Sequence, residues 1–211
     1  QDLMADPYAV YARRVLGLRA LEPIDASPDA RLRGDVIHGT LEAFVRALPQ
    51  DAPLPADADA RLRACADAAF AALADRPEIA ALWRARFDRL VPWILEREGE
   101  RRADVVESQV ETRGETQMGG WRIHARADRI DRLRDGRLAV IDYKTGQAPS
   151  AAEAQSGRKP QLPVEGLIAR RGGFPGLPAA AAALTAAAGV AATATETVAS
   201  ASSKVADAVE A

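Results

Sequence analysis

The sequence predicts an α/β domain in which a layer of helices precedes a mixed, mostly antiparallel sheet. Apolar residues recur at helical spacing through about the first hundred residues. From about residue 104 the pattern changes to the alternation of apolar and polar residues that is typical of half-buried strands. Arg134-Asp135-Gly136 then separates two alternating runs, residues 121–133 and 137–144, and Asp-Gly between such runs is a strong hairpin signal.

The helical layer is expected to contain four helices. Asp6 and Pro7 suit the N-cap and first position of the first helix, and Ser27 and Pro28 suit the start of the second. A proline-rich loop, residues 49–56, separates the second from the third. We expect these helices over residues 6–19, about 28–48, about 57–74 and 77–98.

The C-terminal part is expected to contain one more short helix and a separate tail. KPQLPVEGLIARRGG predicts a helix that ends at the glycine pair 172–173. Residues 179–211 are dominated by Ala with Thr, Ser and Val, and they contain no aromatic residue. With so little bulk to bury, this stretch is expected to be disordered or loosely helical. The predicted domain therefore covers residues 1–178, and the tail covers residues 179–211.

Composition narrows the classes of function. Hydrophobic residues at 48% and charged residues at 27% are typical of a soluble globular protein. No apolar run reaches membrane-spanning length and no signal-peptide pattern is present, so we expect a cytoplasmic protein with no membrane partner. The single Cys65 excludes an intrachain disulfide framework and a self-contained cysteine metal cluster. At a net charge of −2, any affinity for DNA must come from local clusters of Arg and Lys.

The predicted hairpin brings charged side chains together. In the second strand Asp142 and Lys144 share a face and Tyr143 points the other way, because side chains alternate along a strand. A three-residue loop, 134–136, sets Asp128 directly opposite Asp142. A two-residue loop shifts this register by one, and a bulge could restore it. Two carboxylates at contact distance repel each other unless a cation joins them.

This grouping suits metal-dependent hydrolysis of phosphodiesters. The two carboxylates can hold Mg²⁺ through oxygen ligands, and a backbone carbonyl such as that of Tyr143 could complete the coordination. The metal lowers the pKa of a bound water. A lysine such as Lys144 can orient or deprotonate that water, or stabilise the transition state.

The residues alone also allow plainer interpretations. A lone Asp-x-Lys on a strand is usually a solvated charge pair. Asp131 lies on the opposite strand face from Asp128, so we expect a surface carboxylate that pairs with Arg129 or Arg132. A lone histidine such as His38 or His124 is more often structural than a ligand.

Four stretches resemble a known family. ADRIDRLRDGRLAVIDYKTG is similar to the core of the PD-(D/E)XK nuclease superfamily, and more closely to the RecB-like C-terminal nuclease domain of helicase–nuclease subunits. DPYAVYARRVLGLR resembles the opening helix of the AddB nuclease domain, and LRGDVIHGTLEAF resembles the motif that supplies a histidine to the metal. KPQLPVEGLIA resembles the QLP motif. In this order they span about residues 6–178 and resemble AddB-type double-strand break repair proteins of alphaproteobacteria.

The resemblance implies a site as well as a fold. The implied fold is a restriction-endonuclease-like core, a mixed sheet flanked by helices with an N-terminal helical layer. The implied metal ligands include His38, which reverses the structural interpretation of that residue, and Glu107 is a weaker acidic candidate. Gln161 would help to place the lysine or the DNA strand. The implied catalytic residues are Asp128, Asp142, Lys144 and Gln161, and the implied metal ligands are His38, Asp128, Asp142 and the carbonyl of Tyr143.

The implied function is a Mg²⁺-dependent DNA exonuclease, with Mn²⁺ as a possible substitute. It would act on a single-stranded end, the 5′-ended strand by analogy, fed by an AddA-like helicase partner in a complex that processes double-strand breaks for recombinational repair. A catalytically silent module that binds DNA or the helicase partner is the alternative, and a structural scaffold with an incidental hairpin is a third. Backbone contacts to DNA are expected among Arg31, Arg33, Arg129, Arg158 and Lys159.

Three positions depart from the family pattern. Many relatives bind an iron–sulfur cluster through four cysteines, one of them opening a CPF-like stretch. Here Asp6 occupies that position and Cys65 lies elsewhere, so no cluster is expected. Ala125 replaces the glycine that precedes Arg-Ala-Asp in the family, and Glu165 replaces the tyrosine of QLPxY.

Overall fold

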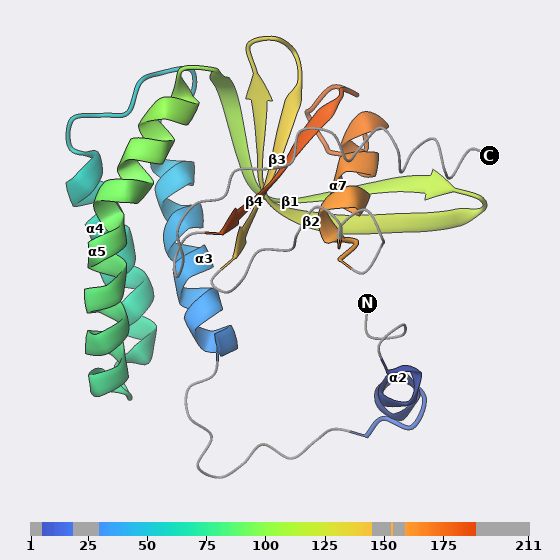
Figure 1. Ribbon diagram of the computed structural model, residues 1–211, viewed down its shortest axis with the longest axis horizontal. Coiled ribbons are helices and arrows are strands. Elements are labelled where there is room, and N and C mark those ends of the chain that lie inside the picture. Colours follow the sequence, from blue (N-terminus) through green and yellow to red (C-terminus); the bar gives the residue numbers. More distant parts are fainter. Residues whose placement is uncertain (1–5, 19–29, 145–152, 154–158, 189–211) are drawn as a thin grey trace.

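The computed structural model describes residues 6–18, 30–144, 153 and 159–188, and its architecture is the predicted α/β fold (Figure 1). A mixed four-stranded sheet is flanked by helices. The elements in chain order are α2 (Pro7–Arg14), α3 (Ala30–Ala47), α4 (Ala58–Phe70), the 3₁₀ helix η1 (Ala71–Leu73), α5 (Pro77–Arg102), β1 (Val105–Met118), β2 (Trp121–Leu133), β3 (Leu138–Lys144), α7 (Gln161–Arg170) and β4 (Ala182–Ala188).

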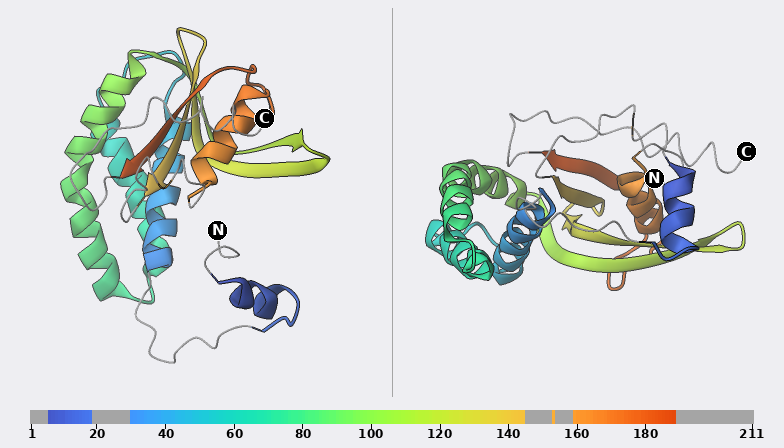
Figure 2. Two further views of the ribbon diagram at one scale, coloured as in Figure 1. Left: turned by 45° about the vertical axis from the view of Figure 1, so that its right-hand side comes forward. Right: turned by 90° about the horizontal axis from the view of Figure 1, so that it is seen from below.

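The helices α3, α4 and α5 form a layer on one side of the sheet (Figures 1 and 2). Their apolar stripes bury Leu41 and Phe44 of α3 against Leu62 of α4 and Phe87 of α5. This is the burial that the helical spacing predicted, because residues three or four apart lie on one face of a helix. The third predicted helix is divided into α4 and η1, and the fourth extends to Arg102.

The sheet has the strand order β1-β2-β3-β4, with β1, β2 and β3 antiparallel. In the β2–β3 hairpin Arg129 pairs with Ile141 and Ile130 pairs with Val140, so that partner numbers sum to 270. This is the register that a three-residue loop predicts. Gly136 supplies the positive φ of 84° that such a loop requires.

The short helix α7 covers the other side of the sheet (Figure 2). Leu162 and Ile168 of α7 pack with Phe174 against Ile130 and Val140 of the central strands. The sheet therefore lies between α7 and the helical layer. The helix α7 contacts all four strands, and its start lies close to the end of β3.

The expectation of a disordered or loosely helical tail is wrong for residues 182–188. These residues form β4, which pairs in parallel with the whole of β3. Leu184 is buried in the core under α7, where Gly166 leaves room for its side chain. Alanine favours helix in isolation, but pairing with β3 satisfies the backbone of β4 and outweighs that preference. Residues 189–211 lie outside the described residues.

The helix α2 is amphipathic, as predicted, and it lies apart from the body of the domain in Figure 1. Its apolar face is exposed, with Tyr8 at 72% of its full exposure. Among the helices that the structure describes, none combines the length and apolar character needed to cross a lipid bilayer.

Candidate functional site

Six residues singled out from the sequence lie together where α3, the middle of β2, the end of β3 and the start of α7 meet. The helical layer contributes one of them, the central strands contribute four, and α7 contributes the last. They are His38 of α3, Asp128 of β2, Asp142, Tyr143 and Lys144 of β3, and Gln161 of α7.

Asp142, Lys144 and Gln161 form a closed triangle of hydrogen bonds. Lys144 Nζ donates to Asp142 Oδ1 at 2.9 Å and to Gln161 Oε1 at 3.1 Å. The amide nitrogen of Gln161 donates to the same Asp142 oxygen at 2.9 Å. Gln161 thus holds both Asp142 and Lys144 in position. It can do so because it is the first residue of α7, whose start lies beside the end of β3.

The Asp142 side chain is almost completely buried, at 2% of its full exposure. Burial raises the pKa of this carboxyl, and the neighbouring Lys144 ammonium acts in the opposite direction. The negative charge of Asp128 raises the pKa further. Lys144 therefore supports the ionised form of Asp142, and a divalent cation would do the same.

Asp128 connects the strands to the helical layer. Its Oδ2 accepts a hydrogen bond of 2.8 Å from the backbone N–H of Tyr143, and it lies 3.5 Å from His38 Nδ1. The His38 ring meets the Tyr143 ring edge-on, with the centroids 6.2 Å apart. The histidine of α3 thus faces the carboxylate of β2 although about ninety residues of chain separate them.

These donors fit part of a divalent metal site. Two atoms that each bind one ion at about 2.1 Å can be at most about 4.2 Å apart, and His38 Nδ1 and Asp128 Oδ2 satisfy that limit. Asp142 is meanwhile held by Lys144 and Gln161. Within the described ranges no three His, Cys, Asp or Glu side chains are already grouped to hold an ion. A bound ion would therefore compete with Lys144 for Asp142.

A carboxylate that was not singled out from the sequence, Glu111 of β1, lies beside this cluster. The flanking pairs Val110–Arg129 and Thr112–Ala127 place it next to Asp128, and its own φ is 53°. Burial raises the pKa of Glu111; the ion pair with Arg126 at 2.7 Å opposes this, and Asp128 adds to it.

The position of Glu111 opposite Asp128 could have been predicted from the glycine pair between the two strands. Gly119-Gly120 forms the two-residue turn between β1 and β2, with φ values of 54° and 80°. Such a turn fixes the register along both strands. The weaker candidate Glu107 lies outside the cluster, because its carboxylate accepts hydrogen bonds of 3.1 Å from Arg132 and from Gln109.

Glu165, at the position of the family tyrosine, is also part of this region. It follows Gln161 by four residues and so lies on the same face of α7. Only 1% of its surface is exposed, and neither of its carboxylate oxygens has a hydrogen bond of good geometry among the described residues. The neighbouring Gln161 amide, which donates to Asp142, lowers the pKa of Glu165 only in part. Burial, followed by the negative charge of Asp142, raises its pKa to about 8. Glu165 is therefore largely protonated at neutral pH in the metal-free chain.

A buried ion network lies on the other face of the strands. Arg129 is completely buried, and its guanidinium bonds Asp131 Oδ1 at 2.6 Å and Glu98 of α5 at 2.6 and 3.0 Å. Burial disfavours the charged forms of Arg129 and Glu98. The negatively charged partners of Arg129 nevertheless raise its pKa, and Arg129 in turn lowers the pKa of Glu98. The Tyr143 hydroxyl lies 3.4 Å from the same guanidinium, so the network supports the strand that carries the site.

This network corrects two expectations. Arg129 cannot contact DNA, because no part of it reaches the surface. Asp131 does pair with Arg129, as expected, but it is a buried carboxylate and not a surface one. Of the other expected DNA contacts, Arg31 and Lys159 are exposed, Arg33 is half-buried, and Arg158 lies outside the described residues.

Relatives of this chain come from several Rickettsia species. Uncharacterized proteins of Rickettsia conorii and Rickettsia felis are each 26% identical over 181 residues, and one of Rickettsia bellii is 26% identical over 178 residues. In each case the match covers 82% of this chain and 21% or 22% of the relative. The chain thus spans about a fifth of the length of the relatives that it matches.

A family model agrees with the observed fold. The model described as the PD-(D/E)XK nuclease superfamily matches residues 2–210, which is nearly the whole chain. The chain therefore belongs to the PD-(D/E)XK nuclease superfamily.

Proposed function

We propose that this chain is a divalent-metal-dependent DNA exonuclease domain that digests a single-stranded end. The observation that carries the proposal is the convergence of Asp128, Asp142 and Lys144 with His38 and Gln161, contributed by two helices and two strands. Acidic side chains can bind a metal ion and a lysine beside them can stabilise developing negative charge, and phosphodiester hydrolysis uses both functions. Membership of a superfamily that consists mainly of nucleases supports the same conclusion.

Each side chain receives a role from its contacts. His38, Asp128 and Asp142 would hold Mg²⁺ or Mn²⁺, with the Tyr143 carbonyl as a further ligand. When bound, such an ion supplies Lewis-acid chemistry and a more acidic water. The side chain of Lys144 is 32% exposed. Its ammonium group can therefore turn from Asp142 toward a phosphate oxygen and stabilise the negative charge that develops there. Gln161 keeps Lys144 and Asp142 in position until then.

The wider setting that we propose is an AddB-type subunit of a cytoplasmic helicase–nuclease complex. Four sequence stretches match that family in order. The relatives are also about five times longer than the matched region, which leaves space for other domains. In this setting an AddA-like helicase would feed single-stranded DNA, the 5′-ended strand by analogy, to the site during processing of double-strand breaks.

A catalytically silent module that binds DNA or the helicase partner is the second candidate. The observation that favours it is that Lys144 and Gln161 already hold Asp142, so that among the described residues no three-ligand metal group is preformed. This candidate predicts that the wild-type chain binds an oligonucleotide but never cleaves it, whichever divalent ion is added.

The test is a Lys144→Met variant assayed on end-labelled single-stranded DNA with Mn²⁺. Because Lys144 is not among the proposed ligands and competes with an ion for Asp142, the variant should bind Mn²⁺ at least as tightly as the wild type. It should nevertheless lose more than about 100-fold in cleavage rate, as other electrostatic catalysts do. Arg89→Met removes an equal charge from an exposed position to which no DNA contact is assigned, and it should retain cleavage within about tenfold. Equal cleavage by wild type and Lys144→Met would contradict the proposal.

A further inference from the structure

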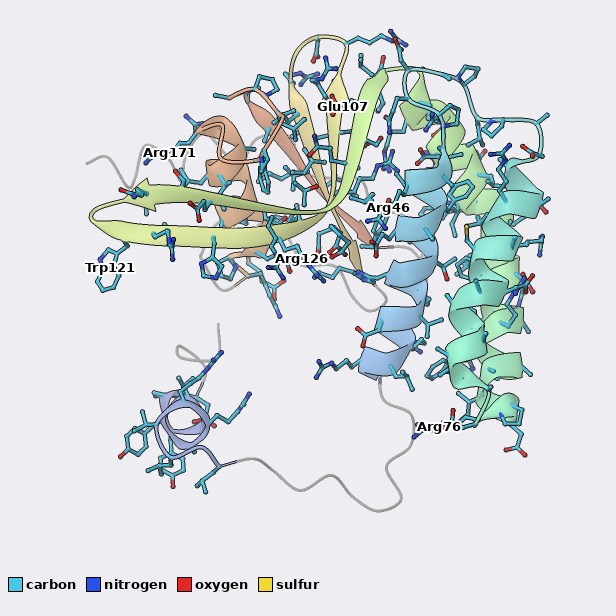
Figure 3. The ribbon with its side chains drawn as sticks, turned by 180° about the vertical axis from the view of Figure 1, so that it is seen from behind. Arg46, Arg76, Glu107, Trp121, Arg126 and Arg171 are labelled. Carbon is cyan, nitrogen blue, oxygen red and sulfur yellow. The ribbon has the colours of Figure 1, made fainter. Side chains whose placement is uncertain are left out.

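The strands β1 and β2 extend beyond the sheet as a two-stranded arm. β2 pairs with β3 only over residues 129–132, whereas its pairing with β1 continues to Met118 and Trp121. Residues 112–127, here called the β1–β2 arm, therefore pair only with each other, and they project from the body in Figures 1 and 3. An isolated two-stranded ribbon is marginally stable in water, so this arm needs support.

The segment after α7 provides that support on one face. The backbone N–H of Glu115 donates to the Gly173 carbonyl at 3.0 Å, and the Arg171 guanidinium donates to the Gln117 carbonyl at 2.6 Å. At Gly114 any side chain would overlap the Phe174 ring, so the glycine permits close packing. The inner face of the arm is therefore covered, and the arm is held in a fixed direction.

The outer face of the arm is basic. Ala125 and Ala127 are in contact with the core under α7, so the alternating residues Arg122, His124 and Arg126 project from the opposite face. All three are exposed, and so is Arg113. Trp121 alternates with Arg122 and so belongs to the same face as Ala125 and Ala127, but it lies at the tip of the arm, where 78% of its surface is exposed. Figure 3 shows it at the far end of the arm from Arg126.

The arrangement of these charges is unfavourable for the chain alone. Arg113 is paired directly across the strands with Arg126, and like charges in that position destabilise a sheet. Arg126 has a partner in Glu111, and Arg122 lies 4.0 Å from Glu115. Arg113 has no ion-pair partner among the described residues. With Arg113 beside Arg126, the three arginines outnumber the two carboxylates next to them, and this excess of positive charge complements an extended anion.

The outer face also leads to the proposed active site. Trp121 and Asp128 are the ends of one continuous stretch of β2, seven residues apart, which is about 24 Å at about 3.4 Å per residue. Glu111, the ion-pair partner of Arg126, lies beside Asp128, whose negative charge raises the pKa of Glu111. A strand that follows the arm from its tip therefore arrives at the carboxylates.

We infer that the outer face of the β1–β2 arm is the track along which single-stranded DNA reaches the active site. Trp121 stacks on a base at the tip, where the strand passes over the end of the arm, and Arg113, Arg122 and Arg126 of the outer face contact phosphates beyond it. An exposed indole favours unpaired bases, whose faces are free to stack, over the closed stack of a duplex. This inference rests on the proposed function, because it assigns a path to the substrate of that site.

The test measures binding of the 211-residue chain to a fluorescein-labelled oligothymidylate by anisotropy, in EDTA so that no cleavage occurs. Trp121→Ala should weaken binding by about 5- to 100-fold, whereas Trp121→Phe retains an aromatic face and should stay close to wild type. Arg113→Ala/Arg122→Ala should reduce the slope of log K against log salt by about 1.4, since each phosphate contact on a single strand contributes about 0.7.

The matched control removes two exposed arginines elsewhere, Arg76→Ala/Arg89→Ala, and should leave the affinity and the salt slope unchanged. If Trp121→Ala and the Arg113/Arg122 double variant both bind DNA like the wild type while thermal melts show them folded, the inference is wrong. In that case the arm is a surface for protein, such as the remainder of a longer polypeptide.

A second substrate separates this inference from the proposed function. Thymidine 5′-p-nitrophenyl phosphate occupies the active site but is too short to reach the arm. The arm variants should hydrolyse it at the wild-type rate with Mn²⁺ while they cleave the oligonucleotide more slowly. No hydrolysis of either substrate by the wild type would overturn the proposed nuclease function, whereas equal oligonucleotide cleavage by wild type and arm variants would overturn the arm alone.

Discussion

Replacing Glu165 by glutamine should make the metal-free chain more stable above neutral pH. The side chain is buried, and the Gln161 amide beside it offsets the burial only in part, so its pKa is raised from 4.5 to about 8. The folded state therefore binds more protons than the unfolded state between these two values, so stability falls as the pH rises through this window. Glu165→Gln keeps the shape of the side chain but cannot ionise, and it should lack this decline.

The size of the effect follows from the shift. A difference of about 3.5 pKa units corresponds to a loss on the order of 5 kcal/mol across the window. Between about pH 5 and 8 the wild type should lose about 1.4 kcal/mol per pH unit relative to Glu165→Gln. Urea unfolding at several pH values in EDTA, followed by circular dichroism, measures this difference. Only the difference between the two chains is compared, because Asp142 and Glu111 also have raised pKa values.

The matched control is Glu107→Gln, which removes a half-buried carboxylate paired with Arg132. Glu165 is still present in this variant, so the variant should keep the decline of stability between about pH 5 and 8. The reasoning about Glu165 is refuted if wild type and Glu165→Gln give parallel curves, because the carboxyl would then titrate at its ordinary pKa despite its burial.

Three other substitutions test separate parts of the structure. Arg129→Met leaves the buried Asp131 without its cation and Glu98 with Arg102 alone, at 3.6 Å, and should cost about 3–5 kcal/mol in urea unfolding; a loss below about 1 kcal/mol would contradict the burial of this network. Gly114→Ala forces a methyl group into the Phe174 ring and should cost about 1–3 kcal/mol, whereas Gly136→Asn at an open turn with φ of 84° should cost less than about 1 kcal/mol. His38→Ala should weaken Mn²⁺ binding by at least about tenfold in calorimetry, and unchanged affinity would remove this histidine from the proposed ligands.

The hairpin and its register could be predicted from local sequence. Asp135-Gly136 determines the turn, the turn determines the pairing, and the pairing sets Asp128 beside Asp142. The helices followed from apolar periodicity in the same way. Each of these inferences depends on residues that are close in sequence, so each could be drawn without knowledge of the tertiary fold.

The errors concern features that depend on distant partners. Alternation placed Arg129 on a strand face, but it could not show that Glu98 of α5 would cover that face and bury the guanidinium. Alanine-rich composition concealed β4, which exists because β3 offers it a free edge. Glu111 was missed because the Gly119-Gly120 turn was not extended into a register across β1 and β2. His38 and Gln161 were identified only through family resemblance, since no local pattern links them to the hairpin.

The most direct test of the central claim is a Mg²⁺ titration of cleavage of single-stranded DNA by the wild type and by Asp142→Ala. In the proposed function, Asp128, Asp142 and Lys144 form a metal-dependent phosphodiesterase site. This assignment predicts no cleavage in EDTA, saturable activity as Mg²⁺ is added to the wild type, and no activity at any Mg²⁺ concentration for Asp142→Ala. Cleavage by the variant that equals that of the wild type, or wild-type cleavage that persists in EDTA, would contradict the claim.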